Sequence, residues 1–257
     1  MFRFEGQSRA EAQAALPVRR SYSGIQEMKE GELTFLRATA ASHSTEPVLL
    51  YSDMPIVEMA EDMDFVKEWL CGMAAMLKKG LSLNLIHNVD RPIEEMMLGL
   101  ESYIPMYMTG QITPYYLKDT NGGPFLHVLR VSGAAALAGE AIIGHQNEGR
   151  YCFTREREDL RYYRRRAAAL LKHAAPLMEI YREDAEAEYQ EFLHAEEQRG
   201  VVPERLDSSA FSNITIEVCS GRWAVVSKDR APRIRFVIRH PKMVEAIEHF
   251  IAPVVGG

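Results

Sequence analysis

Polar side chains directly follow two predicted buried strands. Ser52 and Asp53 come after the apolar run 48–51, and a second polar group closes the run 81–87. Ligands of open α/β sheets collect at the edge where parallel strands end. There the carboxylate of Asp90 would orient the imidazole of His87 for acid–base chemistry. The spacing favours a plainer alternative, in which Asp90 caps a helix and His87 is a hydrogen-bonded residue at a strand end. The candidate ligand-binding residues at this edge are Asp53, His87, Asn88, Asp90 and Arg91.

Two further predicted strands carry polar or aromatic residues. Tyr115 and Tyr116 close one of them, and His127 and Arg130 lie on the next. These four side chains would supply hydrogen bonds and positive charge to an anionic ligand. Because successive strand residues point to opposite faces, His127 and Arg130 are predicted on opposite faces of their strand. A single His among apolar neighbours is more often a hydrogen-bonded structural residue, and this alternative is favoured for His127.

Methionines and tyrosines mark a third candidate region, the predicted helix 93–108. Its residues Tyr103 and Tyr107 flank Pro105, which should kink the helix and free a backbone carbonyl. A wall rich in Met suits an adaptable ligand pocket or a subunit contact, although the same residues would equally fill a core between helices. Nine of the 13 methionines fall between residues 54 and 108: Met54, Met59, Met63, Met73, Met76, Met96, Met97, Met106 and Met108.

The segment 150–166 is the most strongly basic part of the chain. Helical spacing places Arg157, Arg161, Arg164 and Arg165 on one side of a predicted helix, with tyrosines interleaved. Such a face would grip phosphates. Acidic residues lie among these arginines, however, and an acidic stretch follows at 183–197. A solvated, salt-bridged face or a helix–helix contact is therefore the favoured interpretation.

Composition limits the classes of protein to which this chain can belong. It has 257 residues, 47% of them hydrophobic, so it can bury a core and is not disordered by composition. The net charge of −6 argues against a surface built entirely for nucleic acid but allows a local basic patch. The three cysteines are widely spaced and form no CxxC pair, and no metal-binding, nucleotide-binding or nucleophile-elbow motif is present. We therefore expect no metal and no cofactor. We also expect no membrane association, and a cytoplasmic location.

The remaining patterns predict an α/β fold, with α+β as the alternative. Residues 1–45 read as an N-terminal helical and linker segment, with a helix over 26–41. Residues 46–200 read as one domain with the order β-α-β-α-β-β-β-α, in which a long helical region covers 155–197. Residues 205–257 read as a small βββα extension, with a closing helix at 242–251.

The stretches 81–92 (LSLNLIHNVDRP) and 93–116, followed by 151–154 and the Arg/Tyr-rich helix, resemble the C-terminal sensor region of bacterial Cro/CI-type helix-turn-helix transcriptional regulators. The element order is similar to one half of a phospholipase D-like fold. This resemblance covers residues 47–198 and implies a mixed sheet flanked by helices. The catalytic HxKxxxxD motif of that fold is missing, since the only HxK is His240-Pro241-Lys242 and Ile247 stands at the acidic position.

Two functions follow from these observations. The first is a non-enzymatic sensor that binds a small molecule or partner and contacts DNA only through a helix-turn-helix unit absent from this chain. The alternative is an enzyme acting on a phosphorylated or anionic small substrate through His87 and Asp90. The long mixed-charge helical region and the Met-rich helices further predict a homodimer or larger homo-oligomer.

Overall fold

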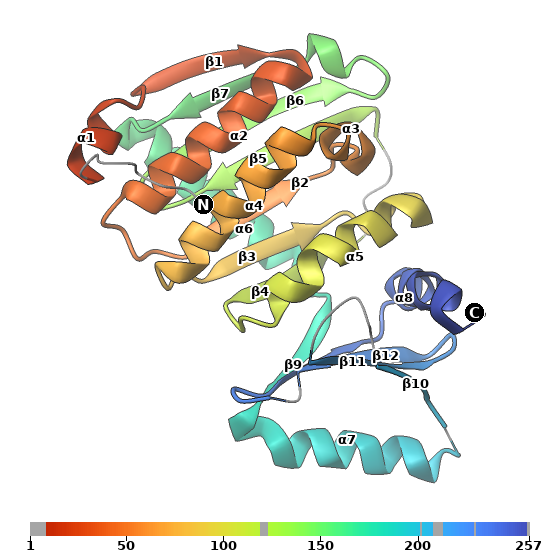
Figure 1. The fold of residues 1–257 in the computed structure, drawn as a ribbon. Coiled ribbons are helices and arrows are strands. Elements are labelled where there is room, and N and C mark those ends of the chain that lie inside the picture. The colour runs from red at the N-terminus through yellow and green to blue at the C-terminus, as the bar shows by residue number, and fades with distance from the viewer. Residues whose placement is uncertain (1–8, 119–122, 201, 208–212, 229, 256–257) are drawn as a thin grey trace. The chain divides into compact units, whose positions relative to one another are not determined.

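The computed structural model describes residues 9–118, 123–200, 202–207, 213–228 and 230–255 (Figure 1). The chain divides into two compact units, each made of two segments that are distant in the sequence. Unit 1 consists of Met1–Asn88 and Gln111–Ala175, and unit 2 of Val89–Gly110 and Pro176–Gly257.

Unit 1 is built on a mixed sheet whose strand order is β1-β7-β6-β5-β2-β3-β4-β8. The neighbours β2, β3 and β4 run parallel, whereas β1, β7, β6, β5 and β2 pair antiparallel in that order. The prediction of a mixed α/β sheet flanked by helices is therefore confirmed. The strands of this sheet are β1 (Arg19–Ser23), β2 (Val48–Ser52), β3 (Leu83–His87), β4 (Ile112–Leu117), β5 (Phe125–Val131), β6 (Ala136–Ile142), β7 (Arg150–Thr154) and β8 (Ala174–Pro176).

Helices cover both faces of the sheet of unit 1 (Figure 1). On one face lie α2 and α4, and on the opposite face α6 packs Leu160 and Ala167 against Leu49, Ile86 and Leu129. The apolar spacing in α4 explains its orientation, because Phe65, Met73, Met76 and Leu77 are all buried. The helices of unit 1 are α1 (Arg9–Ala14), α2 (Gly24–Ala41), α3 (Ile56–Ala60), α4 (Met63–Lys78), the 3-10 turn η1 (Gln146–Glu148) and α6 (Arg157–His173).

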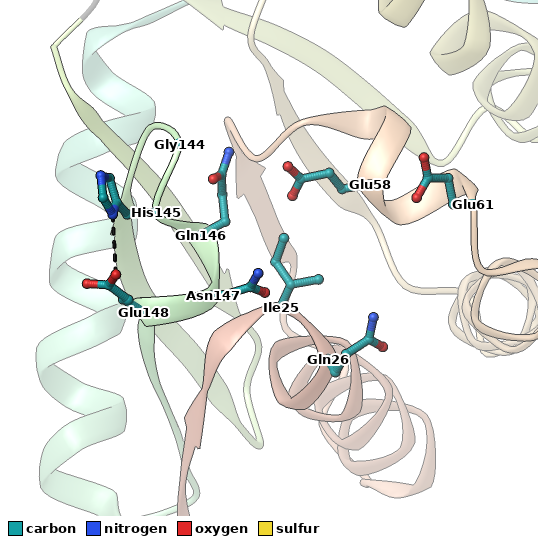
Figure 2. A pocket seen from close by; sticks show the side chains of 9 residues that line it. All are labelled: Ile25, Gln26, Glu58, Glu61, Gly144, His145, Gln146, Asn147 and Glu148. Atoms are coloured by element: carbon teal, nitrogen blue, oxygen red, sulfur yellow. Dashed lines mark hydrogen bonds and ion pairs between the residues drawn. The ribbon is translucent and has the colours of Figure 1, made fainter.

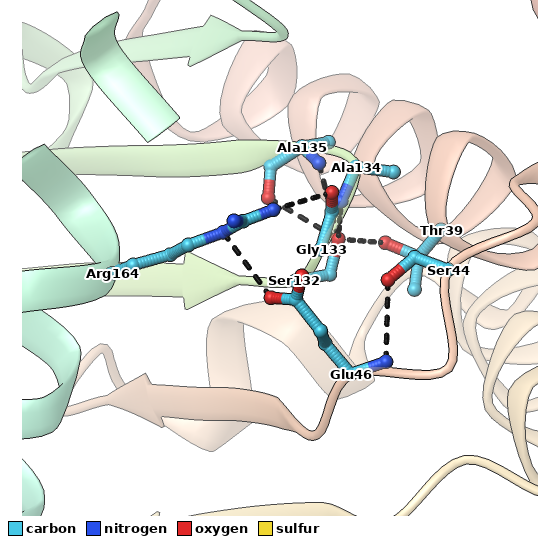
Figure 3. A network of polar contacts seen from close by, with 8 residues as sticks. All are labelled: Thr39, Ser44, Glu46, Ser132, Gly133, Ala134, Ala135 and Arg164. Carbon is cyan, nitrogen blue, oxygen red and sulfur yellow. Dashed lines mark hydrogen bonds and ion pairs between the residues drawn. The ribbon is translucent and has the colours of Figure 1, made fainter. Parts of the chain in front are cut away.

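The turn between β5 and β6 ties three elements of unit 1 together (Figure 3). The Ser132 hydroxyl accepts hydrogen bonds from the backbone of Ala135 at 3.1 Å and from the Thr39 hydroxyl of α2 at 3.0 Å. Arg164 of α6 donates to the carbonyl of Gly133 at 2.7 Å, and its Nε lies 3.4 Å from a carboxylate oxygen of Glu46. Arg164 is thus a structural residue that holds α6 to the turn.

Unit 2 is a second, antiparallel sheet with the order β10-β11-β12-β13-β9. The predicted βββα extension is present as three of its strands and the final helix, with two more strands added. On one side α7 packs Phe192 against Trp223, and Trp223 donates to the buried Glu196 at 2.9 Å. Elsewhere in this unit, α5 packs against α8. The elements are α5 (Ile93–Tyr107), β9 (Met178–Arg182), the 3-10 turn η2 (Glu183–Ala185), α7 (Glu186–Gln198), β10 (Glu204–Asp207), β11 (Ile214–Cys219), β12 (Trp223–Lys228), β13 (Ile234–Ile238) and α8 (Pro241–Val255).

The division into units differs from the predicted boundaries at 45 and 200. The segment assigned to an N-terminal linker contributes β1, which pairs with β7, and α2, which covers the sheet. The middle of the predicted central domain, Val89–Gly110, belongs to unit 2, because α5 packs against α8 there. Within the predicted helical region 155–197, residues 178–182 form β9 instead and pair with β13. All three differences arise from pairings between residues that are far apart in the chain.

Tyr151 of β7 gives unit 1 a predictable response to alkaline pH. Its side chain is buried, and its hydroxyl donates to the Met54 sulfur at 3.8 Å. Burial, followed by the negative charges of Glu58 and Asp53, raises the pKa of Tyr151 to about 12. In the unfolded chain a tyrosine ionises near pH ~10, so the unfolded state loses this proton first. The stability due to this group is complete below about pH 10 and is lost as the pH rises toward 12.

We therefore expect the urea midpoint of wild type to fall more steeply between pH 10 and 11.5 than that of Tyr151→Phe. Urea unfolding at half-unit pH intervals measures both slopes. Tyr162→Phe, which changes an exposed tyrosine, is the matched control and should follow wild type. Parallel curves for wild type and Tyr151→Phe would contradict the assignment.

Candidate functional site

A pair formed by Asp53 and His127 is the most organised polar feature at the predicted edge of the sheet. Asp53 directly follows β2, and its carboxylate accepts the backbone N–H of His127, while its Oδ2 lies 3.1 Å from His127 Nδ1. The Tyr51 hydroxyl donates to the same Oδ2 at 2.9 Å. The Asp53 side chain is 14% exposed and that of His127 is 37% exposed. A largely buried carboxylate thus fixes the orientation of an imidazole that remains accessible to solvent.

Residues of the neighbouring strands extend this pair into a row of polar side chains. The row lies on the same face of the sheet as α6, beside the part of that face that α6 covers. In the β5–β6 ladder His127 lies opposite Glu140, and in the β6–β7 ladder Glu140 lies opposite Arg150. Residues directly opposite each other in such ladders share a face of the sheet. The next cross-strand pair, Phe125 with Ile142, is apolar, yet these side chains are 48% and 49% exposed. The exposed apolar pair therefore stands beside the oriented imidazole.

His87 and Tyr116 lie on the other face of the sheet. His87 is opposite Tyr116 in the β3–β4 ladder, and the β2–β3 ladder places it beside Ser52 rather than Asp53. Arg130 also faces that side, where it is buried against α2 and paired with Glu32. The predicted alternation of His127 and Arg130 is thus confirmed. The structure also removes Arg130 from any ligand surface, because its guanidinium already has a buried carboxylate partner.

Two other predicted residues belong to unit 1. Tyr115 lies on the side of the sheet that α6 covers, and Asn88 lies just beyond the end of a strand. Tyr115 packs against the apolar cluster under α6 and is half-buried. Asn88 follows β3 directly, as Asp53 follows β2, and the parallel register brings Tyr51 level with Ile86. Asp53 and Asn88 therefore end adjacent parallel strands, as the sequence predicted.

The remaining four predicted residues belong to unit 2. Asp90 forms an ion pair with Lys242 of α8 at 2.6 Å, and Arg91 is paired with Glu95 at 2.9 Å. The prediction that Asp90 caps α5 is wrong, because Pro92 occupies the cap position. Tyr107 is buried, and its ring stacks on that of Tyr103 at 6.0 Å, so burial raises its pKa well above the ordinary value. Tyr107 is therefore a core residue of unit 2.

A cavity of unit 1 was missed by sequence reasoning (Figure 2). It encloses about 380 Å³ and is lined by residues from the start of α2, from α3 and from the loop that contains η1. A second cavity adjoins it and shares Gln26, Glu58 and Glu61. In the sequence, only the polar run 144–148 indicates the first of these cavities. Its lining residues are Ile25, Gln26, Glu58, Glu61, Gly144, His145, Gln146, Asn147 and Glu148.

Within the ranges that the structure describes, no three His, Cys, Asp or Glu side chains are grouped closely enough to hold a metal ion. No helix among those described is both long and apolar enough to cross a bilayer.

Comparison with known proteins gives distant structural likenesses only. No family model and no curated protein matches the sequence. TrmBL2, an archaeal chromatin protein described as showing a novel mode of DNA binding, is 11% identical over 62% of this chain and 54% of its own, with a TM-score of 0.42. NucT from Helicobacter pylori is 11% identical over 62% of this chain and 98% of its own, with a TM-score of 0.39.

A third similar structure is polyphosphate kinase from Porphyromonas gingivalis, which is 11% identical over 93% of this chain and 50% of its own, with a TM-score of 0.39. The chain thus spans about half the length of two of these three proteins. At TM-scores below 0.5 the likenesses assign neither a fold family nor a function to the chain.

Proposed function

We propose that the chain is a regulatory domain that binds a small molecule on the exposed surface around His127 and passes the bound state to a DNA-binding unit. The observation that carries this proposal is the imidazole of His127, held in one orientation by Asp53 beside the exposed pair Phe125 and Ile142. An apolar contact area with a few fixed polar groups is the usual composition of a small-molecule site. The phospholipase D-like architecture and the homo-oligomer belong to the same proposal.

A second candidate is an enzyme acting on an anionic small substrate. One observation favours it: a carboxylate that orients an accessible imidazole is also the arrangement of an acid–base catalyst. In this candidate the pair is Asp53 with His127, which takes the place of His87 with Asp90. The two candidates differ in whether the ligand is chemically changed.

A thermal-shift screen of metabolites and nucleotides tests both candidates with the same variants. A compound present at 100 times its Kd stabilises a protein by about 2.7 kcal/mol. For a chain of this size that corresponds to a rise in Tm of about 5–10 °C. We expect at least one compound to give this shift with wild type and not with His127→Ala or Phe125→Ser.

Two histidine variants locate the binding surface. His194→Ala, an exposed histidine on α7, is the matched control and should keep the shift. His145→Ala tests the cavity, because His145 lines it. A shift lost with His145→Ala and kept with His127→Ala would place the ligand in the cavity and overturn the proposed surface. Conversion of the compound by wild type, abolished by His127→Ala, would favour the enzyme over the sensor.

A further inference from the structure

Four cations form a continuous exposed stripe along α6. At about 100° per residue, Arg157, Arg161, Arg165 and Lys172 lie within an arc of about 80° on the helix surface. All four residues are exposed. We call them the α6 stripe. Successive arginines in it are four residues apart, which is about 6 Å along the helix axis, and the stripe is about 22 Å long from end to end.

The four cations of the α6 stripe form no salt bridge within the part of the chain that the structure describes, although the exposed Glu158 lies about 20° beyond the edge of the stripe. None of its four side chains has a carboxylate within 4.0 Å or a hydrogen-bond partner there, so these residues form the solvated face that the sequence predicted, but without its salt bridges. Arg155 and Arg164 of the same segment differ, because Arg155 donates to Gln13 and Arg164 donates to the carbonyl of Gly133 (Figure 3). Basic side chains without partners on a chain of net charge −6 indicate a surface that receives an anion.

The shape of the α6 stripe indicates which anion it fits. A protein interface has an apolar centre, whereas the stripe contains only the small exposed Ala168 between its cations. Single-stranded nucleic acid is bound by stacking bases on aromatic rings. The exposed aromatic of this helix, Tyr162, lies about 60° around the axis outside the arc of the stripe. A straight row of cations fits a stiff, extended polyanion.

We propose that the α6 stripe binds the phosphate backbone of double-stranded DNA without reading its sequence. This contact adds to the expected route to DNA through a separate helix-turn-helix unit. It also does not depend on the proposed ligand surface, because none of the four cations belongs to that surface. Arginine suits the role because its guanidinium can donate two parallel hydrogen bonds to one phosphate.

Fluorescence anisotropy with two labelled 20-bp duplexes of unrelated sequence tests the proposal over a series of salt concentrations. For four phosphate contacts, log K should fall with log[salt] with a slope of about −3 to −4, which is a loss of about 100-fold between 50 and 200 mM salt. Both duplexes should bind equally. Replacing all four stripe residues by alanine should flatten the slope to near zero, and alanine favours the helix that it must keep.

Charge reversal on one helix supplies the matched comparison. Arg161→Glu removes a stripe cation, while Arg166→Glu makes the same change in net charge about 140° around the helix from Arg161. We expect Arg161→Glu to reduce the magnitude of the slope by at least 1 and to weaken binding more than tenfold, with Arg166→Glu within threefold of wild type. Circular dichroism confirms that both variants are folded.

Four results would overturn the proposal. The first is the absence of any anisotropy change for wild type at 100 μM protein in 50 mM salt. The second is equal weakening of binding by Arg161→Glu and Arg166→Glu. The third is tighter binding of a single strand of the same length. The fourth is a loss of self-association in Arg161→Glu without DNA binding by wild type, which would assign the stripe to a second copy of the chain.

Discussion

Replacing Arg130 by alanine should lower the free energy of unfolding of unit 1 by about 3–5 kcal/mol, because it leaves a buried carboxylate without its cation. The Glu32 side chain is 1% exposed. Arg130 Nε donates to both of its oxygens, at 2.9 and 3.0 Å, and a second guanidinium nitrogen lies 2.9 Å from one of them. Urea unfolding followed by Trp69 fluorescence in a Trp223→Phe background would report on unit 1, since Trp69 lies in α4.

Two variants separate this effect from the loss of an arginine as such. Arg37→Ala breaks the exposed ion pair with Glu68, whose atoms are 2.5 Å apart, and should cost less than ~1 kcal/mol. The double variant Glu32→Leu with Arg130→Met removes both charges and should recover more than half of the lost stability. A cost below about 1 kcal/mol for Arg130→Ala would show that the buried pair is not needed for the fold.

Gly139→Ala should be the most damaging conservative change in the sheet of unit 1. A Cβ at this position of β6 would lie 2.2 Å from the backbone oxygen of Arg150 and 2.5 Å from the ring of Tyr151. Neither atom can retreat without displacing β7, because Tyr151 is buried. We expect a loss of about 2–3 kcal/mol, the upper part of the range for overpacking in a core.

Gly80→Ala provides the comparison for Gly139→Ala in the same unfolding assay. Gly80 has a φ of +86°, and no atom lies within 4 Å of the place that a Cβ would take, so alanine there meets only backbone strain of about 1–2 kcal/mol. A smaller loss for Gly139→Ala than for Gly80→Ala would mean that β7 moves away at little cost. In the sequence Gly139 weakens the case for a strand, whereas in the structure it makes room for one.

Local patterns in the sequence predict the strands and helices well. The apolar run at β2, the alternation in β5 and the spacing in α4 are properties of neighbouring residues, and they place these elements within a few residues of their observed bounds. Alternation also predicts that His127 and Arg130 face opposite sides of the sheet. For the same reason the carboxyl ends of β2 and β3 were predictable, since each strand is followed by a helix in the chain.

The partners of these elements were not predictable, because pairing depends on residues far apart in the sequence. Asp53 contacts His127, 74 positions later, and no local pattern links them. From the sequence we expected His87 to pair with Asp90, because the two residues are close in the chain. The strand ladders instead place His87 on the opposite face of the sheet from Asp53. The contributions of β1 to unit 1 and of α5 to unit 2 were missed for the same reason.

The discontinuous origin of unit 2 sets the order in which its parts can be buried during synthesis. The buried side chains of α5, among them Met96, Leu100 and Ile104, leave the ribosome well before the other residues of their unit, which begin at Pro176. At about 5–20 residues per second, roughly 7–30 s pass between the synthesis of Tyr107 and that of Val255 at the end of α8. Throughout that interval the apolar side chains of α5 lack the partners that bury them, so we expect a chaperone that binds apolar segments to recognise this part of the nascent chain.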